Sequence, residues 1–119
     1  MIYSVEQANA LLPDLRVRIE RIRQGRKALI ESAERIEERI AADGGGIADS
    51  AWFELTGQMK TDIEAMAEMG IILRDPDEGL VDFPSEIEGK PAFLCWRSEE
   101  PEVAFWHPPD SGFAGRRAL

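Results

Sequence analysis

The chain has 119 residues and a formal net charge of −9, with 44% hydrophobic and 31% charged residues. This length and composition are typical of one soluble globular domain and exclude a disordered chain. No apolar stretch reaches the roughly 18 residues of a membrane helix, and general nucleic-acid binding is disfavoured because phosphates need a positive surface. The single Cys excludes an internal disulfide and no secretory leader is visible, so we predict a cytoplasmic location.

A long helix is predicted from Ser4 to the glycines at positions 44–46. Ser4 and Gln7 form a capping-box pattern, and Pro13 either kinks this helix or begins a new one. Gly25 lowers helix stability, which indicates close approach of another backbone or a change in packing. Apolar residues recur at alternating spacings of three and four, as in a coiled coil or long helical hairpin. This predicted seam comprises Leu12, Leu15, Ile19, Ile22, Leu29, Ala33, Ile36 and Ile40, with Arg26 as the one polar interruption.

A second helix is predicted over residues 50–70, and the short connection folds it back antiparallel on the first. Its predicted seam comprises Trp52, Leu55, Met59, Ile63 and Met66. This helix is too short to cover the start of the long one, which must pack on the sheet or on a second subunit. Exposed apolar stripes of that length are rarely left to water, so we predict a homodimer. The predicted interface comprises Leu12, Leu15, Ile19 and Ile22.

After Gly70 the hydrophobic period changes from helix-like to strand-like. Two hairpins are predicted, one from residues 71–74 and 80–83, the other from residues 91–97 and 102–107. The last two strands have no polar face, so both sides of the sheet should be covered, the second side by the tail around Phe113 or by another subunit. The predicted fold is one α+β domain over residues 1–119. A long antiparallel helical hairpin (4–70) precedes an antiparallel sheet of three or four strands with a C-terminal tail (71–119).

A basic stretch interrupts the acidic composition. Residues 16–27 contain six basic residues and one Glu, a local charge of +5. Such a run either contacts phosphate or forms the solvated face of a helix, and the solvated face is the favoured interpretation.

Side chains that can bind ions or transfer protons gather at the ends of the predicted strands. Asp82, Arg97 and His107 can bind an anion or carry out acid–base chemistry, with Trp106 and Arg116 nearby. The favoured alternative is structural, with Asp82 paired to Arg97, Arg116 or Arg117 and His107 hydrogen-bonded at a strand end. A metal site is a further alternative, because the donor types suit zinc although the tight spacing of zinc motifs is missing. The candidate ligands are Asp82, Cys95 and His107, with Glu99 or Glu100 as a fourth.

Catalytic residues are not predicted. A nucleophilic Cys95 needs a base within hydrogen-bond reach, and the expected pairing does not place His107 directly opposite it. The sequence contains no nucleotide-binding Gly-rich loop, no His-Glu-x-x-His and no Gly-x-Ser-x-Gly motif. No cofactor is expected.

Several motifs along the chain occur together in one known pattern. They are Ser4 to Pro13, Gly79 to Pro84, Leu94 to Trp96, Trp106, His107, Gly112, Gly115 and Arg116. In these motifs the chain resembles a bacterial family known as domain of unknown function 2203. The resemblance covers almost the whole chain and implies a small cytoplasmic bacterial protein, without implying an activity or catalytic residues.

We therefore predict a non-enzymatic assembly or protein-interaction module whose acidic loops suit a partner with a basic surface. The alternative is a small-molecule or metal-binding protein, with an enzyme included, whose site lies around Asp82, Arg97 and His107.

Overall fold

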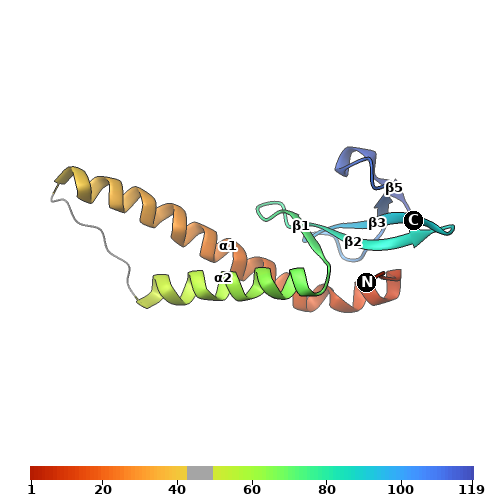
Figure 1. The fold of residues 1–119 in the computed structure, drawn as a ribbon, viewed down its shortest axis with the longest axis horizontal. Coiled ribbons are helices and arrows are strands. Elements are labelled where there is room, and N and C mark those ends of the chain that lie inside the picture. Colours follow the sequence, from red (N-terminus) through yellow and green to blue (C-terminus); the bar gives the residue numbers. More distant parts are fainter. Residues whose placement is uncertain (43–49) are drawn as a thin grey trace.

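Two packed helices precede a five-stranded antiparallel sheet, which confirms the predicted α+β fold (Figure 1). This computed structural model describes the backbone of residues 1–42 and 50–119 and the side chains of residues 1–35 and 50–119. The predicted seam residues Ile36 and Ile40 and the predicted glycine-rich helix end lie outside the described side chains. The molecule measures 62 × 25 × 23 Å, because the helical hairpin extends well beyond the sheet.

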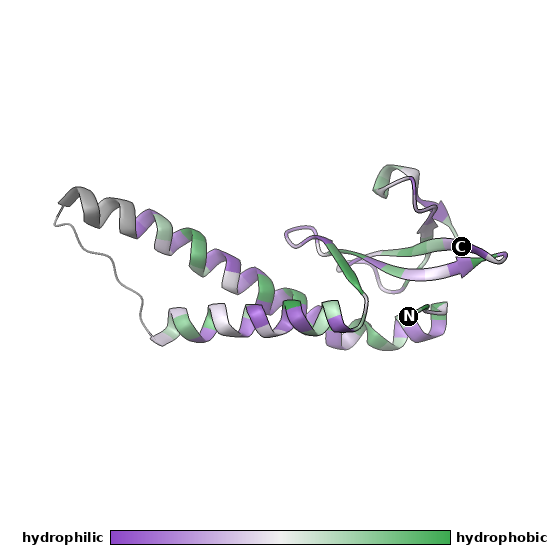
Figure 2. Cartoon of the chain, viewed as in Figure 1, coloured by the Kyte–Doolittle hydropathy of each residue, from purple (hydrophilic) through white to green (hydrophobic). Residues whose placement is uncertain are grey.

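Helix α1 (Val5–Ala42) begins with the predicted capping box. Ser4 Oγ accepts a hydrogen bond from the Gln7 backbone N–H at 3.1 Å, and the Ser4 N–H donates to Gln7 Oε1 at 2.9 Å. The helix continues through Pro13, so this residue does not begin a new helix. The polar and apolar residues alternate along both helices, as Figure 2 shows by hydropathy.

The N-terminal part of α1 packs on the sheet. Leu12, Leu15, Ile19 and Ile22 are only 0–2% exposed within the single chain. The strands cover them with a complementary set of buried residues, Val81, Phe83, Leu94 and Trp96. Of the two coverings considered for this segment, the sheet is the one observed. The prediction that these four residues form a dimer interface is therefore wrong, because the core of the same chain already buries them.

The distal part of α1, from Gly25 onward, packs on α2 (Ser50–Glu68). The residues it buries there differ from those of the predicted seam. Arg26 is partly exposed, and Leu29 and Ala33 are exposed. Small residues are buried instead, namely Gly25, Ala28 and Ser32. A straight helix drifts by about 20° per heptad relative to a strict seven-residue repeat, so the contact line leaves the predicted seam. The small side chains then allow α2 to approach closely.

The contact line on α2 also differs from its predicted seam. Met66 is buried and Met59 and Trp52 are partly buried, but Leu55 and Ile63 are 38% and 46% exposed. Trp52 Nε1 donates to Ser32 Oγ at 2.9 Å, which joins the distal parts of the two helices.

Replacing Gly25 with Ala should destabilise the protein by about 1–2 kcal/mol, although Ala is the better helix former. A Cβ at this position would lie 2.4 Å from Met59 Cβ and 2.9 Å from the Leu55 carbonyl oxygen, so the helices would have to separate. Gly57→Ala is the matched control on α2, because a Cβ there meets no atom within 4 Å and should stabilise the helix by roughly 0.5–1 kcal/mol. Urea denaturation followed by circular dichroism measures both changes. A Gly25→Ala protein as stable as Gly57→Ala would contradict this packing.

The arginine stretch of α1 (Arg16, Arg18, Arg21, Arg23 and Arg26) binds groups of the same chain. Arg16 Nη2 donates to the Glu100 carbonyl at 2.9 Å, and Arg23 donates to the carbonyls of Pro76 and Asp77 at 2.9 Å. Arg26 pairs with the Asp77 carboxylate at 2.5 Å. The predicted solvated face is thus a connection between α1 and the loops of the sheet.

Two further arginines of this stretch surround a buried carboxylate that the sequence analysis did not single out. Asp62 on α2 is 0% exposed. Arg21 donates to both of its oxygens, at 2.8 and 2.9 Å, and Arg18 donates to Oδ1 at 2.9 Å. A buried carboxylate is tolerated only with such partners, and these contacts join α1 to α2.

The sheet is a meander in the order β1-β2-β3-β4-β5. Its strands are β1 (Ile72–Asp75), β2 (Leu80–Ile87), β3 (Lys90–Arg97), β4 (Phe105–His107) and β5 (Arg117–Ala118). The tail contributes the fifth strand, so the sheet has more strands than the three or four predicted. The strands β2 and β3 pair along their full length through a tight turn in which Glu88 and Gly89 both have positive φ, 54° and 77°. Such dihedrals are what a two-residue hairpin requires.

Candidate functional site

Asp82, Cys95 and His107 lie on the face of the sheet that points away from α1. Their neighbours Val81, Phe83, Leu94 and Trp96 are in the core against α1, and side chains alternate between the two faces of a strand. Asp82 pairs with Cys95 in register, whereas His107 pairs with Phe93, two residues from Cys95. As predicted, Cys95 and His107 are not directly opposite. They are diagonal neighbours on one face.

The three side chains form a compact cluster. Asp82 and His107 are each 2% exposed and Cys95 is 1% exposed. One potential ligand atom from each, an oxygen, a sulfur and a nitrogen, lies within 4.8 Å of the others. Three consecutive strands of the sheet therefore bring together the metal-ligand set that was considered from the sequence.

The ring of His107 is oriented by the backbone. Its Nδ1 lies 2.8 Å from the Pro108 carbonyl oxygen, which can only accept, so Nδ1 carries the hydrogen. Its Nε2 lies 3.0 Å from Asp82 Oδ2. Nε2 is therefore the ring atom that points at the carboxylate.

Arg74 on β1 is the cationic partner of Asp82. Its Nε donates to Asp82 Oδ2 at 2.9 Å, and the guanidinium lies over the Phe93 ring at 5.5 Å. Asp82 was predicted to pair with Arg97, Arg116 or Arg117, and this prediction is wrong. The register shifts between Leu73 and Asp75, which is a local irregularity that no sequence pattern indicated. The sequence signal that could have identified Arg74 as the partner of Asp82 was its positive charge at the end of the first predicted strand.

Burial and the nearby Asp82 carboxylate raise the pKa of the Cys95 thiol to about 11, although the Arg116 guanidinium acts in the opposite direction. Cys95 is therefore protonated near neutral pH in the metal-free protein. Reactive cysteines instead have lowered pKa values in electropositive, accessible surroundings. This environment does not favour a nucleophilic role for Cys95.

A cavity of about 330 Å³ adjoins the cluster and contains the three side chains in its wall. The segment after β4 forms the opposite wall. The lining residues are Arg74, Leu80, Asp82, Cys95, His107, Pro109, Asp110, Ser111, Gly112 and Phe113. The tail around Phe113 thus lies over this face of the sheet, as one of the predicted alternatives required.

Two other predicted site residues differ in their relation to the cluster. Arg97 lies apart from it and pairs with Glu78 at 2.5 Å and with Glu99 at 3.0 Å. Arg116 lies beside Cys95, whose carbonyl oxygen accepts a hydrogen bond from Nη2 at 3.2 Å. It also pairs with Glu100 at 2.5 Å and stacks on the rings of Phe105 and Phe113, at 4.2 and 4.7 Å.

Neither Glu99 nor Glu100 serves as a fourth ligand, since an arginine occupies each of them. Trp106 pairs in register with Leu94 and packs against the helix-side core. It therefore faces away from the cluster.

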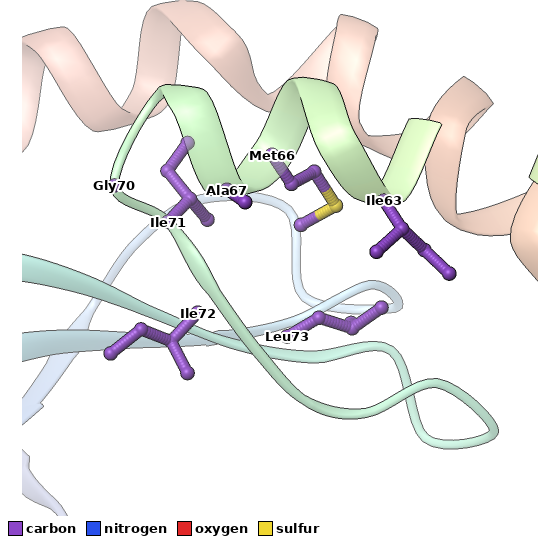
Figure 3. A pocket seen from close by; sticks show the side chains of 7 residues that line it. All are labelled: Ile63, Met66, Ala67, Gly70, Ile71, Ile72 and Leu73. Carbon is purple, nitrogen blue, oxygen red and sulfur yellow. The ribbon is translucent and has the colours of Figure 1, made fainter. Parts of the chain in front are cut away.

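A second cavity, of about 380 Å³, lies between α2 and β1 (Figure 3). Its lining carries no acidic or basic side chain and no thiol or hydroxyl. The residues are Ile63, Met66, Ala67, Gly70, Ile71, Ile72 and Leu73. This wall can accommodate apolar groups but offers nothing for acid–base or metal chemistry.

Comparison with known proteins places the chain in a family without adding an activity. Within the described residues, no helix is long and apolar enough to cross a membrane. No curated protein and no solved structure matches the chain. The profile of one protein family matches all of residues 1–119, and it confirms the resemblance seen in the motifs. The chain belongs to the family described as Uncharacterized conserved protein (DUF2203).

Proposed function

We propose that this protein binds a divalent transition-metal ion, Zn²⁺ in the first place, through Asp82, Cys95 and His107. One observation carries the proposal: oxygen, sulfur and nitrogen donors from three neighbouring strands are buried together within 4.8 Å. Carboxylate, thiolate and imidazole are the ligand types that zinc accepts in proteins. The mixture of hard and soft donors does not suit Mg²⁺ or Ca²⁺, which prefer sites made of oxygen alone.

The orientation of His107 supports this role. Metal-binding imidazoles commonly donate their other ring N–H to a backbone carbonyl, and His107 Nδ1 does so to Pro108. This leaves Nε2 as the ligand atom. Two ligands of one tetrahedral zinc ion lie roughly 3.4 Å apart, given bonds of about 2.1 Å. The 3.0 Å between Nε2 and Asp82 Oδ2 needs only a small adjustment.

The charges of the cluster also balance with a divalent ion. The Asp82 carboxylate and a Cys95 thiolate together carry two negative charges, which one such ion neutralises. Buried anions are stable only when they are paired or coordinate a metal. Arg74, whose side chain is about half exposed, remains outside this balance.

Three protein ligands leave a fourth position for an exchangeable group. Structural zinc sites are closed by four protein ligands, whereas sites with three keep a position for water or substrate. Here the three side chains also line the 330 Å³ cavity, so an exchangeable group has space. The proposed site is therefore an open one.

Titration of the metal-free, reduced protein tests the proposal. We expect one Zn²⁺ per chain by calorimetry, a thiolate-to-metal absorption band with Co²⁺, and a higher melting temperature with either ion. Asp82→Asn, Cys95→Ser and His107→Ala should each weaken binding by more than about tenfold, because loss of even an outer partner of a ligand costs 10–100-fold.

Glu86→Gln is the matched control, since Glu86 is an exposed carboxylate on the same strand. It should bind metal as the unchanged protein does. Absence of zinc binding by the folded protein, or equal binding by all four variants, would identify the cluster as an ion-pair network of Arg74, Asp82 and His107.

A role in assembly stays as our second proposal, on a different surface from the one first expected. The distal hairpin leaves Leu29, Ile30 and Phe53 exposed by 40%, 55% and 63%. Exposed apolar groups of this size favour contact with another protein or a second copy. The acidic loop at Asp77 and Glu78 is already paired with Arg26 and Arg97, which weakens the argument for a basic partner there. A cytoplasmic location, which would keep Cys95 reduced, likewise stays a prediction.

A further inference from the structure

Arg74 has donor groups that its contacts with Asp82 and Phe93 leave available. The guanidinium uses Nε for Asp82, at 2.9 Å. No described residue accepts a hydrogen bond from its two terminal amino groups, and the side chain is 46% exposed. The contact with the Phe93 ring, at 5.5 Å, and the Nε bond together restrict the orientation of the plane. A fork of N–H donors held in this way is suited to a planar carboxylate.

Part of the wall of the cavity beside Arg74 is apolar. Leu80, Pro109 and Phe113 line it together with the polar cluster. Its volume of about 330 Å³ corresponds to roughly ten water-sized groups, at about 30 Å³ each. A ligand that fits is therefore small and has an apolar body.

The distribution of charge places the anionic end of such a ligand at Arg74. Asp110 also lines the cavity, and its carboxylate would repel an anion bound on its side. Asp82 is already paired with Arg74 at 2.9 Å and lies 3.0 Å from His107 Nε2. These two carboxylates leave little net positive charge, which favours a monoanion over a multiply charged phosphate.

We propose that this cavity binds a small organic carboxylate, with the carboxylate on the terminal amino groups of Arg74 and the apolar body between Leu80 and Phe113. The proposal goes beyond metal binding and does not require it. With an ion on Asp82, Cys95 and His107, the same cavity would bring a carboxylate oxygen next to the open coordination position. The site would then recognise a carboxylate-bearing substrate or effector.

Benzoate is a suitable probe, because it combines a carboxylate with a compact apolar ring. Protein NMR of the full chain, first with a chelator and then with zinc, should show benzoate shifting the resonances of Leu80, Phe113 and Gly112. Benzamide, the neutral analogue, and inorganic phosphate should each bind at least tenfold more weakly. The chelated sample keeps this result independent of whether zinc binds.

Two variants separate charge recognition from the apolar wall. Arg74→Gln should weaken benzoate binding at least tenfold, and Phe113→Ala should weaken it with the charge intact. Phe113 is 42% exposed, so its replacement should not unfold the protein. Arg117→Gln is the control, because Arg117 stacks on Trp106 away from the cavity. Melting curves confirm that each variant is folded.

Three results would overturn the proposal. Equal binding of benzamide and benzoate would exclude recognition through Arg74, and equal binding of phosphate would indicate a general anion site. Unchanged benzoate binding in both folded variants would place the ligand elsewhere. Binding lost in both variants but kept in Arg117→Gln would support it.

Discussion

Replacing Ile19 by Glu should unfold the single chain rather than separate two subunits. Ile19 is 0% exposed in the core between α1 and the sheet. An ionised carboxylate there has no partner in the described core, and the cost should be about 4–5 kcal/mol or more. Domains of this size are stable by only about 5–15 kcal/mol, so most of the folded population would be lost. Circular dichroism and urea denaturation would show this directly.

The same helix provides a control for this experiment. Val17 is two residues away and 54% exposed, so Val17→Glu should change stability by no more than about 0.5 kcal/mol. Ile19→Ala supplies a graded change, with an expected loss of about 2–4 kcal/mol from the cavity it creates. An Ile19→Glu protein that stays folded and differs only in sedimentation would mean that this part of α1 faces a partner subunit after all.

The stability of the metal-free protein should fall between about pH 9 and pH 11 because of Cys95. Its pKa is raised from 9.0 to about 11 in the folded protein, first by burial and then by Asp82. The folded state therefore retains the thiol proton in a range where the unfolded chain loses it. The resulting stabilisation is complete below pH 9 and is lost as the pH rises toward 11. A shift of this size corresponds to roughly 2–3 kcal/mol in total.

Cys95→Ala isolates this contribution, because Cys95 is the single Cys of the chain. Urea denaturation of both proteins at several pH values, with a chelator present, measures the difference. The unfolding free energy of the unchanged protein should approach that of the variant as the pH rises. Tyr3, whose pKa is also raised by burial, titrates in both proteins and cancels in the comparison. Parallel curves would contradict the raised thiol pKa.

The arginine stretch illustrates how a sequence pattern acquires a different meaning in the fold. Its local charge suggested a solvated face or a phosphate contact. In the structure these side chains bind Asp62, Asp77 and the carbonyls of two loops. The acidic surplus elsewhere in the chain supplies their partners. The same contacts hold the turn between β1 and β2 beside α1, at one end of the proposed site.

The sequence by itself determined the order and type of the main elements. The period of three and four residues before Gly70 and of two residues after it distinguishes helix from strand through side-chain geometry alone. Ser4 and Gln7 marked the start of α1 because a capping box needs only local contacts. The identities of Asp82, Cys95 and His107 also indicated a metal-ligand set, since donor chemistry belongs to the residue type.

Only the tertiary structure decided where those elements meet. The distance between Cys95 and His107 depends on the register of β3 with β4, and the partner of Asp82 depends on an irregular pairing near Arg74. The burial of Ile19 against the sheet instead of a second subunit depends on how α1 lies across the strands. Each of these is a long-range contact, and local periodicity carries no information about the relative placement of segments that are distant along the chain.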